Sequence, residues 1–401
     1  MISLMRLLSI AVLTGAMAGC SWFGGDDNAP EEIEPNPLTS IKAEVKLQTL
    51  WSRKVGGGAD DRAIRLRPTI VGGRIFAASA DGMVKALTTD TGREIWSTQI
   101  RGVYSKEELS FGFTKDLDVI TGGVGANEDL VVVGTGAGEI VALNQSDGTL
   151  AWRSKVTSEM LSVPAIDREF VVVQTIDGKL AAFRVLDGER AWIYTTNIPS
   201  LTLRGTASPI IEADIVISAF ANGRIAFLDK ENGLAAFDQR VGVSKGDSDL
   251  ERLVDVDGKM VVLDGKLHVA SFQGRIVAIE LATGRMVWAE DASSVSGLGS
   301  GFGNVYLASA DSQVIAYNAD NGREVWRVDA LLHRDLTAPE SLGSYIAVSD
   351  FDGYIHLLAQ SDGRFVGRRK VGKSIKAGLI SDSGRLYAMD DGGNLTAMEI
   401  R

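Results

Sequence analysis

Ala80-Asp81-Gly82-Met83-Val84-Lys85-Ala86-Leu87, followed by Asp90-Thr91-Gly92-Arg93-Glu94-Ile95-Trp96, is the clearest copy of a repeat that runs along most of this chain. It holds two glycine turns ten residues apart and a tryptophan four residues after the second turn. The second-turn glycine recurs at Gly92, Gly148, Gly188, Gly233, Gly284, Gly322 and Gly363, and the position four residues later holds Trp96, Trp152, Trp192, Phe237, Trp288, Trp326 and Gly367. A mean spacing of about 45 residues is typical of a four-stranded propeller blade.

The two ends of the chain supply the remaining copy. A turn at Gly393 opens an eighth copy, and the chain reaches Arg401 before the last strand of that copy. Near the N-terminus, Trp51 lies in an apolar segment with no turn before it. Pairing of this segment with the last copy would close the ring and remove an open sheet edge. The sequence therefore predicts an all-β fold over residues 41–401: an eight-bladed β-propeller of four-stranded antiparallel blades, closed by its N-terminal strand.

Residue types within the repeat favour strands. Val84 and Ala86 stand two residues apart in the first copy, and six of the eight copies have alanine at the second of these positions. Such period-two alternation is the strand pattern, and Asp-Gly turns suit tight hairpins. We interpret the recurring tryptophan as packing between neighbouring blades. Because Gly367 has no side chain to fill that gap, we expect the outer edge of the seventh blade to be the loosest joint.

The N-terminal residues resemble a lipoprotein leader. A short apolar run follows Arg6, and small residues lead to Met17-Ala18-Gly19-Cys20. This run is too short to span a bilayer. The last four residues resemble a bacterial lipobox, with methionine where leucine is usual. The resemblance implies a signal peptide at 1–19, acylation of Cys20 and, with Ser21 next, sorting to the outer membrane. Residues 20–40 are acidic and contain proline, so we predict a flexible tether there.

Composition argues against several functions. Of 401 residues, 41 are basic and 52 acidic, so a formal charge of −11 excludes a generally basic, nucleic-acid-binding surface. Three histidines and one cysteine leave little for a metal site or a nucleophile, and no hydrolase, zinc-protease or phosphate-loop motif occurs. We therefore expect no enzyme activity, no cofactor and no metal.

Two other functions stay as alternatives. The Asp-x-x-Thr-Gly-x-x-x-Trp spacing resembles that of the eight-bladed quinoprotein dehydrogenases, which implies a periplasmic quinone-dependent oxidoreductase. Those enzymes are much longer, and many have adjacent cysteines, whereas this chain has one cysteine. A propeller that binds carbohydrate or peptidoglycan would need exposed aromatic residues in its central funnel, which the inner-strand register does not obviously supply.

The leader, tether and eight repeats together resemble the BamB family, lipoprotein subunits of the outer-membrane β-barrel assembly machinery of Gram-negative bacteria. The most specific segments are Ser200-Leu201-Thr202-Leu203-Arg204-Gly205 and Arg252-Leu253-Val254-Asp255-Val256-Asp257. The resemblance implies a scaffold, anchored by lipid and facing the periplasm, that helps unfolded outer-membrane proteins to fold and insert. It also implies that Leu201, Leu203, Arg204, Asp255 and Asp257 contact the periplasmic domains of the barrel-forming subunit, BamA.

The repeat register agrees with one binding patch. Arg204 lies 19 residues before Gly223, and Asp255 lies 19 residues before Gly274. Both therefore occupy the same connection in consecutive blades, on the face that carries the Asp-Gly turns, and we expect them side by side. Two interpretations stay open: these residues bind a partner, or Arg204 pairs with Asp255 while the leucines fill the blade junction. No role is assigned to the long connection at 101–121.

Overall fold

The computed structural model describes residues 33–59, 62–105, 119–203, 205–242 and 254–401. The chain divides into two units, Met1–Glu34 and Pro35–Arg401, and the second is the subject from here on. The expected signal peptide, Cys20 and tether residues 20–32 lie outside the described residues. Within those described, no helix has the length and apolar character needed to cross a bilayer.

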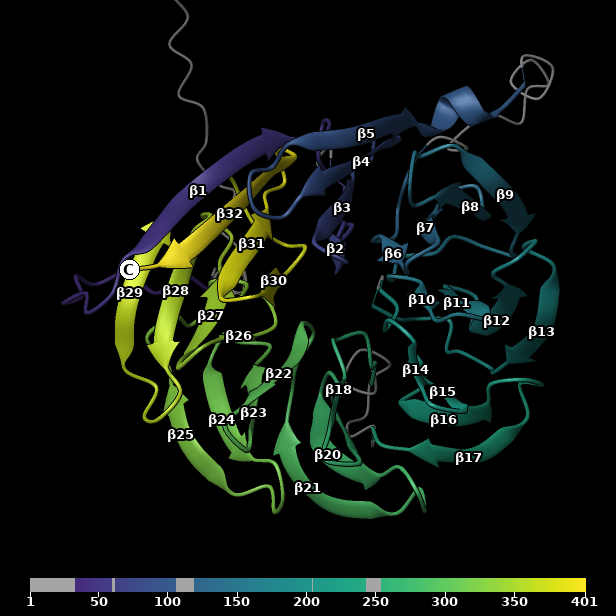
Figure 1. The fold of residues 1–401 in the computed structure, drawn as a ribbon. Coiled ribbons are helices and arrows are strands. Elements are labelled where there is room, and N and C mark those ends of the chain that lie inside the picture. The colour runs from purple at the N-terminus through teal and green to yellow at the C-terminus, as the bar shows by residue number, and fades with distance from the viewer. Residues whose placement is uncertain (1–32, 60–61, 106–118, 204, 243–253) are drawn as a thin grey trace, which may run out of the picture. The chain divides into compact units, whose positions relative to one another are not determined.

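Eight four-stranded antiparallel sheets follow one another around a ring, which confirms the predicted propeller (Figure 1). The first blade contains β2 (Thr69–Val71), β3 (Arg74–Ala78), β4 (Met83–Thr88) and β5 (Glu94–Gln99), followed by a short 3-10 helix η1 (Ile100–Val103). The second contains β6 (Gly125–Ala126), β7 (Leu130–Gly134), β8 (Glu139–Asn144) and β9 (Leu150–Lys155). The third contains β10 (Ala165–Ile166), β11 (Phe170–Thr175), β12 (Lys179–Arg184) and β13 (Arg190–Thr195).

The next four blades repeat this order from inner to outer strand. The fourth contains β14 (Ile210–Glu212), β15 (Ile215–Ala219), β16 (Arg224–Asp229) and β17 (Ala235–Arg240), and the fifth contains β18 (Val261–Leu263), β19 (Lys266–Ala270), β20 (Gly274–Glu280) and β21 (Met286–Ala292). The sixth contains β22 (Gly297–Gly301), β23 (Asn304–Ala308), β24 (Val314–Asn318) and β25 (Glu324–Val328). The seventh contains β26 (Glu340–Leu342), β27 (Tyr345–Ser349), β28 (Tyr354–Ala359) and β29 (Phe365–Lys370).

The eighth blade joins the two ends of the chain, as predicted. It contains β30 (Leu379–Asp382), β31 (Arg385–Met389) and β32 (Asn394–Ile400), and its outer strand is β1 (Leu47–Lys54). In this pairing Trp51 lies opposite Ala397, with a register shift between Thr49 and Trp51. The ring therefore closes through backbone hydrogen bonds between its first and last strands.

Each repeat tryptophan fastens its blade to the next one. The indole N–H of Trp96 donates to the carbonyl of Gln145 (2.9 Å), three residues before Gly148. Gly148 has a positive φ of 72°, and a Cβ there would lie 2.5 Å from the Trp96 ring. Glycine is needed for both reasons, because it tolerates that φ and leaves room for the ring. The same contact recurs from Trp326 to Gln360 and Gly363.

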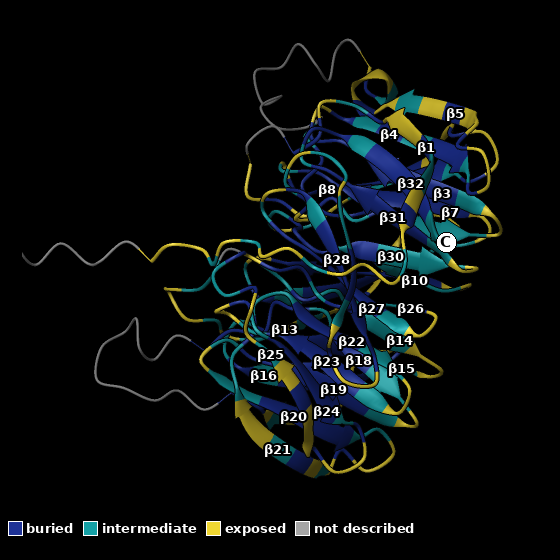
Figure 2. Ribbon diagram, turned by 90° about the vertical axis from the view of Figure 1, so that its left-hand side faces the viewer, coloured by how far each residue is buried: buried dark blue, intermediate teal, exposed yellow. Residues whose placement is uncertain are grey.

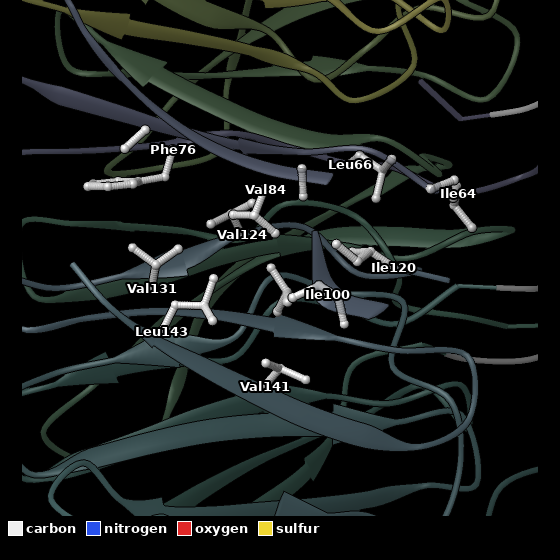
Figure 3. Packing of buried hydrophobic residues seen from close by; sticks show 14 of the residues in the cluster. Ile64, Leu66, Phe76, Val84, Ile100, Ile120, Val124, Val131, Val141 and Leu143 are labelled. Atoms are coloured by element: carbon white, nitrogen blue, oxygen red, sulfur yellow. The ribbon is translucent and has the colours of Figure 1, made fainter. Parts of the chain in front are cut away.

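Apolar side chains fill the space between blades. One cluster joins strands of the first and second blades, with Phe76 and Val84 facing Val131 and Leu143 (Figure 3). The two middle strands of each sheet are largely buried and the innermost strands are mostly half-buried, whereas turns and outer strands such as β5 and β21 are largely exposed (Figure 2). Burial of this apolar surface between sheets is the main stabilising contribution.

The joint at Gly367 differs from the expectation of looseness. Residues 35–46, here called the strap, lie along the seventh blade, and the N–H groups of Glu44 and Val45 both donate to the carbonyl of Val366 (2.8 and 3.1 Å). Val45 packs against the core between blades seven and eight, and a Cβ on Gly367 would lie 3.0 Å from the Val45 carbonyl oxygen. The strap therefore occupies the place that a tryptophan takes in the other copies.

The strap also begins before the predicted end of the tether at residue 40. The N–H of Asn36 donates to the carbonyl of Leu332 (3.0 Å), and Leu38 packs against the core of the sixth and seventh blades. The chain is thus held on the ring from Asn36 onward.

Candidate partner-binding site

Two connections between blades form the candidate site on one face of the ring. One joins β13 to β14 and the other joins β17 to β18; Arg204 and residues 243–253, including Arg252 and Leu253, lie outside the described residues. The backbone N–H of Leu203 donates to Oδ2 of Asp255 (3.0 Å). The adjacency predicted from the repeat register is therefore confirmed for the loop pair, which we define as residues 200–205 and 254–257.

The first loop presents one leucine to solvent and holds back the other. Leu201 is 47% exposed. Leu203 is half-buried and lines a small cavity of about 210 Å³ together with Ile176 and Ile198. The two leucines predicted to act together thus differ: Leu201 is available at the surface, and Leu203 packs into the junction.

The second loop is anchored by its valines. Val256 is fully buried in the core of the fourth and fifth blades, and Val254 contacts Gly242 closely. The carbonyl of Asp255 accepts a hydrogen bond from the N–H of Phe272 (2.7 Å). This segment is consequently fixed on both sides of Asp255.

Both aspartates are buried in this structure. Asp255 has no exposed surface and Asp257 is 9% exposed. A Cβ on Gly205 would lie 2.4 Å from Asp257, so Gly205 allows the first loop to close over that carboxyl group. Asp255 and Asp257 were predicted as partner contacts; the structure shows Asp255 supporting Leu203, and a direct contact with a partner stays a prediction.

The two carboxyl groups interact with each other. Burial raises the pKa of Asp255. Burial raises the pKa of Asp257 well above its usual range, and the charge of Asp255 and a hydrogen bond to it raise it further. Two adjacent buried carboxyl groups cannot easily both ionise, so ionisation of the pair as a whole is shifted to higher pH.

A larger cavity of about 530 Å³ opens beside the loop pair and shares Asp257 with it. Connections between blades and inner strands line it, among them residues 63–67, 161–164 and 335–340. Inside, Lys259 Nζ lies 2.9 Å from Glu340 Oε2. The repeat pattern does not indicate this pair. The one signal in the sequence is Glu340 itself, a carboxylate at the start of a short inner strand.

His356 belongs to a buried cluster of charged side chains. His356 Nε2 lies 3.0 Å from Asp350 Oδ2, and Arg368 Nε donates to His356 Nδ1 (2.9 Å). Arg368 also donates to the carbonyl of Thr39 (2.7 Å), so the cluster holds the strap. In the described ranges, no group of three His, Cys, Asp or Glu residues is arranged to hold a metal ion.

Comparisons with known proteins agree in sequence and structure. Residues 80–328 match the family model described as outer membrane protein assembly factor BamB. The assembly factor BamB of Pseudomonas aeruginosa is 38% identical, over 98% of each chain. That of Escherichia coli is 32% identical, over 92% of this chain and 91% of its own. The crystal structure of BamB from Moraxella catarrhalis superposes with a TM-score of 0.77 at 29% identity, covering 88% of this chain and 99% of that one.

A more distant likeness concerns the fold alone. The quinohemoprotein alcohol dehydrogenase of Comamonas testosteroni superposes with a TM-score of 0.66 at 14% identity, over 88% of this chain and 76% of that one. Such a likeness shows shared architecture, because one fold hosts many functions.

Proposed function

The chain belongs to the BamB family of outer membrane protein assembly factors, and from this premise we propose that it is a non-enzymatic scaffold of the outer-membrane β-barrel assembly (Bam) complex that docks on the periplasmic domains of BamA. The loop pair is the docking surface. The observation that carries this assignment is the hydrogen bond from Leu203 to buried Asp255, which braces the loop that exposes Leu201.

The physical argument rests on a rigid support. An apolar side chain on a braced loop loses little conformational freedom when a partner covers it, so more of the burial free energy is retained. Covering the exposed half of Leu201 contributes about 1 kcal/mol. Arg204, three residues after Leu201 in the sequence, brings a planar set of donors for a carboxylate or a backbone carbonyl.

A lipid anchor at Cys20 would hold the propeller at the outer membrane, facing the periplasm. Each buried methylene contributes about 0.8 kcal/mol, so more than one acyl chain gives stable anchoring. The net charge of −11 supports this arrangement, because an acidic ring has no attraction of its own to anionic lipid. Cys20→Ser, combined with Leu201→Asp so that docking on BamA does not retain it, should move the protein from the membrane fraction to the soluble periplasm; retention of this double variant in the membrane would refute the anchor.

Unfolded outer-membrane proteins are the proposed clients, bound by strand addition at the outer edges of blades. The outer strands β5, β13, β21 and β25 end their sheets. They also expose Ile95, Ile193, Val287 and Val325 (36–47%). Hydrogen exchange with added client peptides should show new protection along these strands, and unchanged exchange there would contradict the idea.

The two alternatives receive no support from a specific observation. The likeness to a quinohemoprotein dehydrogenase is one of fold. Among the described residues that line the cavity of about 530 Å³ there is no aromatic side chain for a sugar to stack on.

The test of docking is a detergent pull-down from the native envelope with wild type, Leu201→Asp and Arg204→Glu. Leu186→Asp is the matched control, because Leu186 is 89% exposed and lies in the turn between β12 and β13, at the opposite face of the ring. Wild type and control should retain BamA, and both site variants should lose it while keeping their circular dichroism. Retention by all four proteins would move the docking surface elsewhere, and absence of BamA from the wild-type sample would overturn the proposed partner.

A further inference from the structure

The cavity of about 530 Å³, called the central cavity from here on, contains a group of linked charged side chains that we call its floor. Glu340 in β26 receives the backbone N–H and the hydroxyl of Ser381 in β30 (3.0 and 2.9 Å). Its other carboxylate oxygen lies 2.9 Å from Lys259 Nζ and 4.0 Å from an Arg67 guanidinium nitrogen. These residues come from the fifth, seventh and eighth blades and from the connection into the first blade. The cavity is therefore a recess with an ionic floor.

Positive charge exceeds negative charge in this recess. Four cations line it, Arg65, Arg67, Lys259 and Lys376, whereas the carboxyl groups are Asp257, Asp335 and Glu340. Glu340 faces both Lys259 and Arg67. In a chain with a net charge of −11, a lining with four cations and three carboxyl groups is locally rich in positive charge, and Lys376 also faces Asp391, outside the lining, at 3.4 Å.

The floor lacks part of the negative charge that its cations need. Lys259 and Arg67 share one carboxylate, and both side chains are 30% exposed. Burial, in spite of the nearby Glu340, lowers the pKa of Lys259, and repulsion by Arg67 lowers it further. A second carboxylate placed in the recess would therefore gain attraction from cations that are already partly desolvated.

Apolar residues and hydroxyl-bearing residues make up the rest of the lining. Val163, Pro164, Pro209 and Met260 line the cavity together with the charged groups. Its volume of about 530 Å³ lies within the range of roughly 300–1,000 Å³ typical of binding pockets. A lining that combines apolar side chains with a few convergent charges suits a ligand that carries both apolar and charged groups.

We propose that the central cavity is a second binding site, which receives a loop of a partner protein that carries carboxylates beside an apolar side chain. The carboxylates meet Lys259 and Arg67 at the floor and Arg65 and Lys376 nearer the mouth, and the apolar side chain contacts the apolar part of the lining. A loop tip fits better than a lipid headgroup, because the apolar part of the lining lies beside the cations inside a recess rather than on an exposed basic surface.

The site does not depend on docking through Leu201. Arg65 and Lys376 are exposed at the surface and make few internal contacts in the described structure: Arg65 donates to the carbonyl of Val295 (3.3 Å), and Lys376 lies 3.4 Å from Asp391. Reversing these two charges should therefore alter binding without unfolding the ring. Arg62 and Lys373 are exposed on the same two connections and lie outside the cavity lining, so they provide a control with an equal change of charge.

The experiment titrates the full chain with a disulfide-cyclised peptide whose tip is Asp-Leu-Asp, followed by fluorescence anisotropy, with an Asn-Leu-Asn peptide for comparison. We expect the acidic peptide to bind wild type, the control R62E/K373E and Leu201→Asp alike. Binding to R65E/K376E should weaken about tenfold or more, since two attractive charges become repulsive, and the Asn-Leu-Asn peptide should not bind.

Three results would overturn the proposal. The first is no binding of the acidic peptide to wild type up to about 1 mM, a concentration that corresponds to about −4 kcal/mol. The second is equal binding by R65E/K376E and R62E/K373E. The third is that wild type binds phosphatidylglycerol vesicles but not the peptide, and that R65E/K376E no longer binds the vesicles. This result would assign the cavity to lipid. Retained peptide binding by a Leu201→Asp variant that loses BamA would separate the two sites.

Discussion

Replacing Gly367 with tryptophan should destabilise the propeller, although the repeat alone suggests the opposite. Five copies have tryptophan four residues after the turn glycine, and Trp51 in the closing strand makes a sixth. Consensus reasoning therefore predicts that tryptophan at position 367 would increase stability. In the structure the position is filled by the strap, and a Cβ on Gly367 would already lie 3.0 Å from the Val45 carbonyl oxygen. The indole would also find no following turn, because β32 ends at Ile400.

The magnitude follows from the contacts that the strap would lose. Two hydrogen bonds, from Glu44 and Val45 to Val366, contribute about 1 kcal/mol each. The half-buried Val45 side chain contributes about 1 kcal/mol more. We therefore expect the free energy of unfolding to fall by about 3 kcal/mol. With an unfolding entropy of about 2.1 cal/mol/K per residue, Tm falls by about 4 °C.

The assay is thermal and urea unfolding, combined with hydrogen exchange of the strap amides. Phe237→Trp is the matched control, because it makes the same insertion where a turn glycine, Gly284, already faces the ring. There the new indole N–H can reach the carbonyl of Leu281, and stability should rise by about 1 kcal/mol. Equal stabilisation by both variants, with Glu44 and Val45 amides still protected in Gly367→Trp, would refute the role of the strap.

Two further predictions concern buried charges. Asp257→Asn should raise Tm more at pH 8 than at pH 5. Folding raises the pKa of Asp257, so its carboxyl group contributes fully to the stability of the folded state below its unfolded pKa. That contribution is lost as pH rises through the folded pKa, whereas asparagine does not ionise. Exposed Asp129→Asn is the control, and a pH-independent difference for Asp257→Asn would contradict the raised pKa of Asp257. Glu340→Gln should lower the free energy of unfolding, measured in urea, by about 2 kcal/mol. This loss is smaller than that for a fully buried ion pair, because the Lys259 side chain is 30% exposed. Adding Lys259→Met to Glu340→Gln should recover part of that loss. If Glu340→Gln alone were as stable as wild type, the ion pair would not stabilise the floor.

The sequence predicted those features that the repeat itself encodes. Gly148 and Trp96 recur because each blade needs the same turn and the same contact with its neighbour, so spacing alone identifies the strands and their order. Closure by Trp51 followed from counting copies. The register placed the two loops of the site side by side, since equal offsets from a turn glycine mean equal positions in consecutive blades.

Features outside the repeat could not be predicted in this way. The strap has no counterpart in other copies, so nothing in the pattern indicated that Val45 would cover Gly367. Asp255 is buried against a loop that lies 52 residues earlier in the chain. Lys259 and Glu340 are 81 residues apart, and their contact arises from the curvature of the ring rather than from local sequence.

Closure by the first and last strands also sets an order of events during folding. Leu47 pairs with Ile400, so no complete ring exists until almost the whole chain has been synthesised. Until then β32 and β1 are both unpaired edges, and such edges recruit strands from other chains. A late closure between residues so distant in sequence is also intrinsically slow. The unfinished protein, rather than the finished one, is therefore the species most exposed to aggregation and proteolysis, and a chain that loses either end should be removed by the cell's quality control rather than persist as a partial propeller.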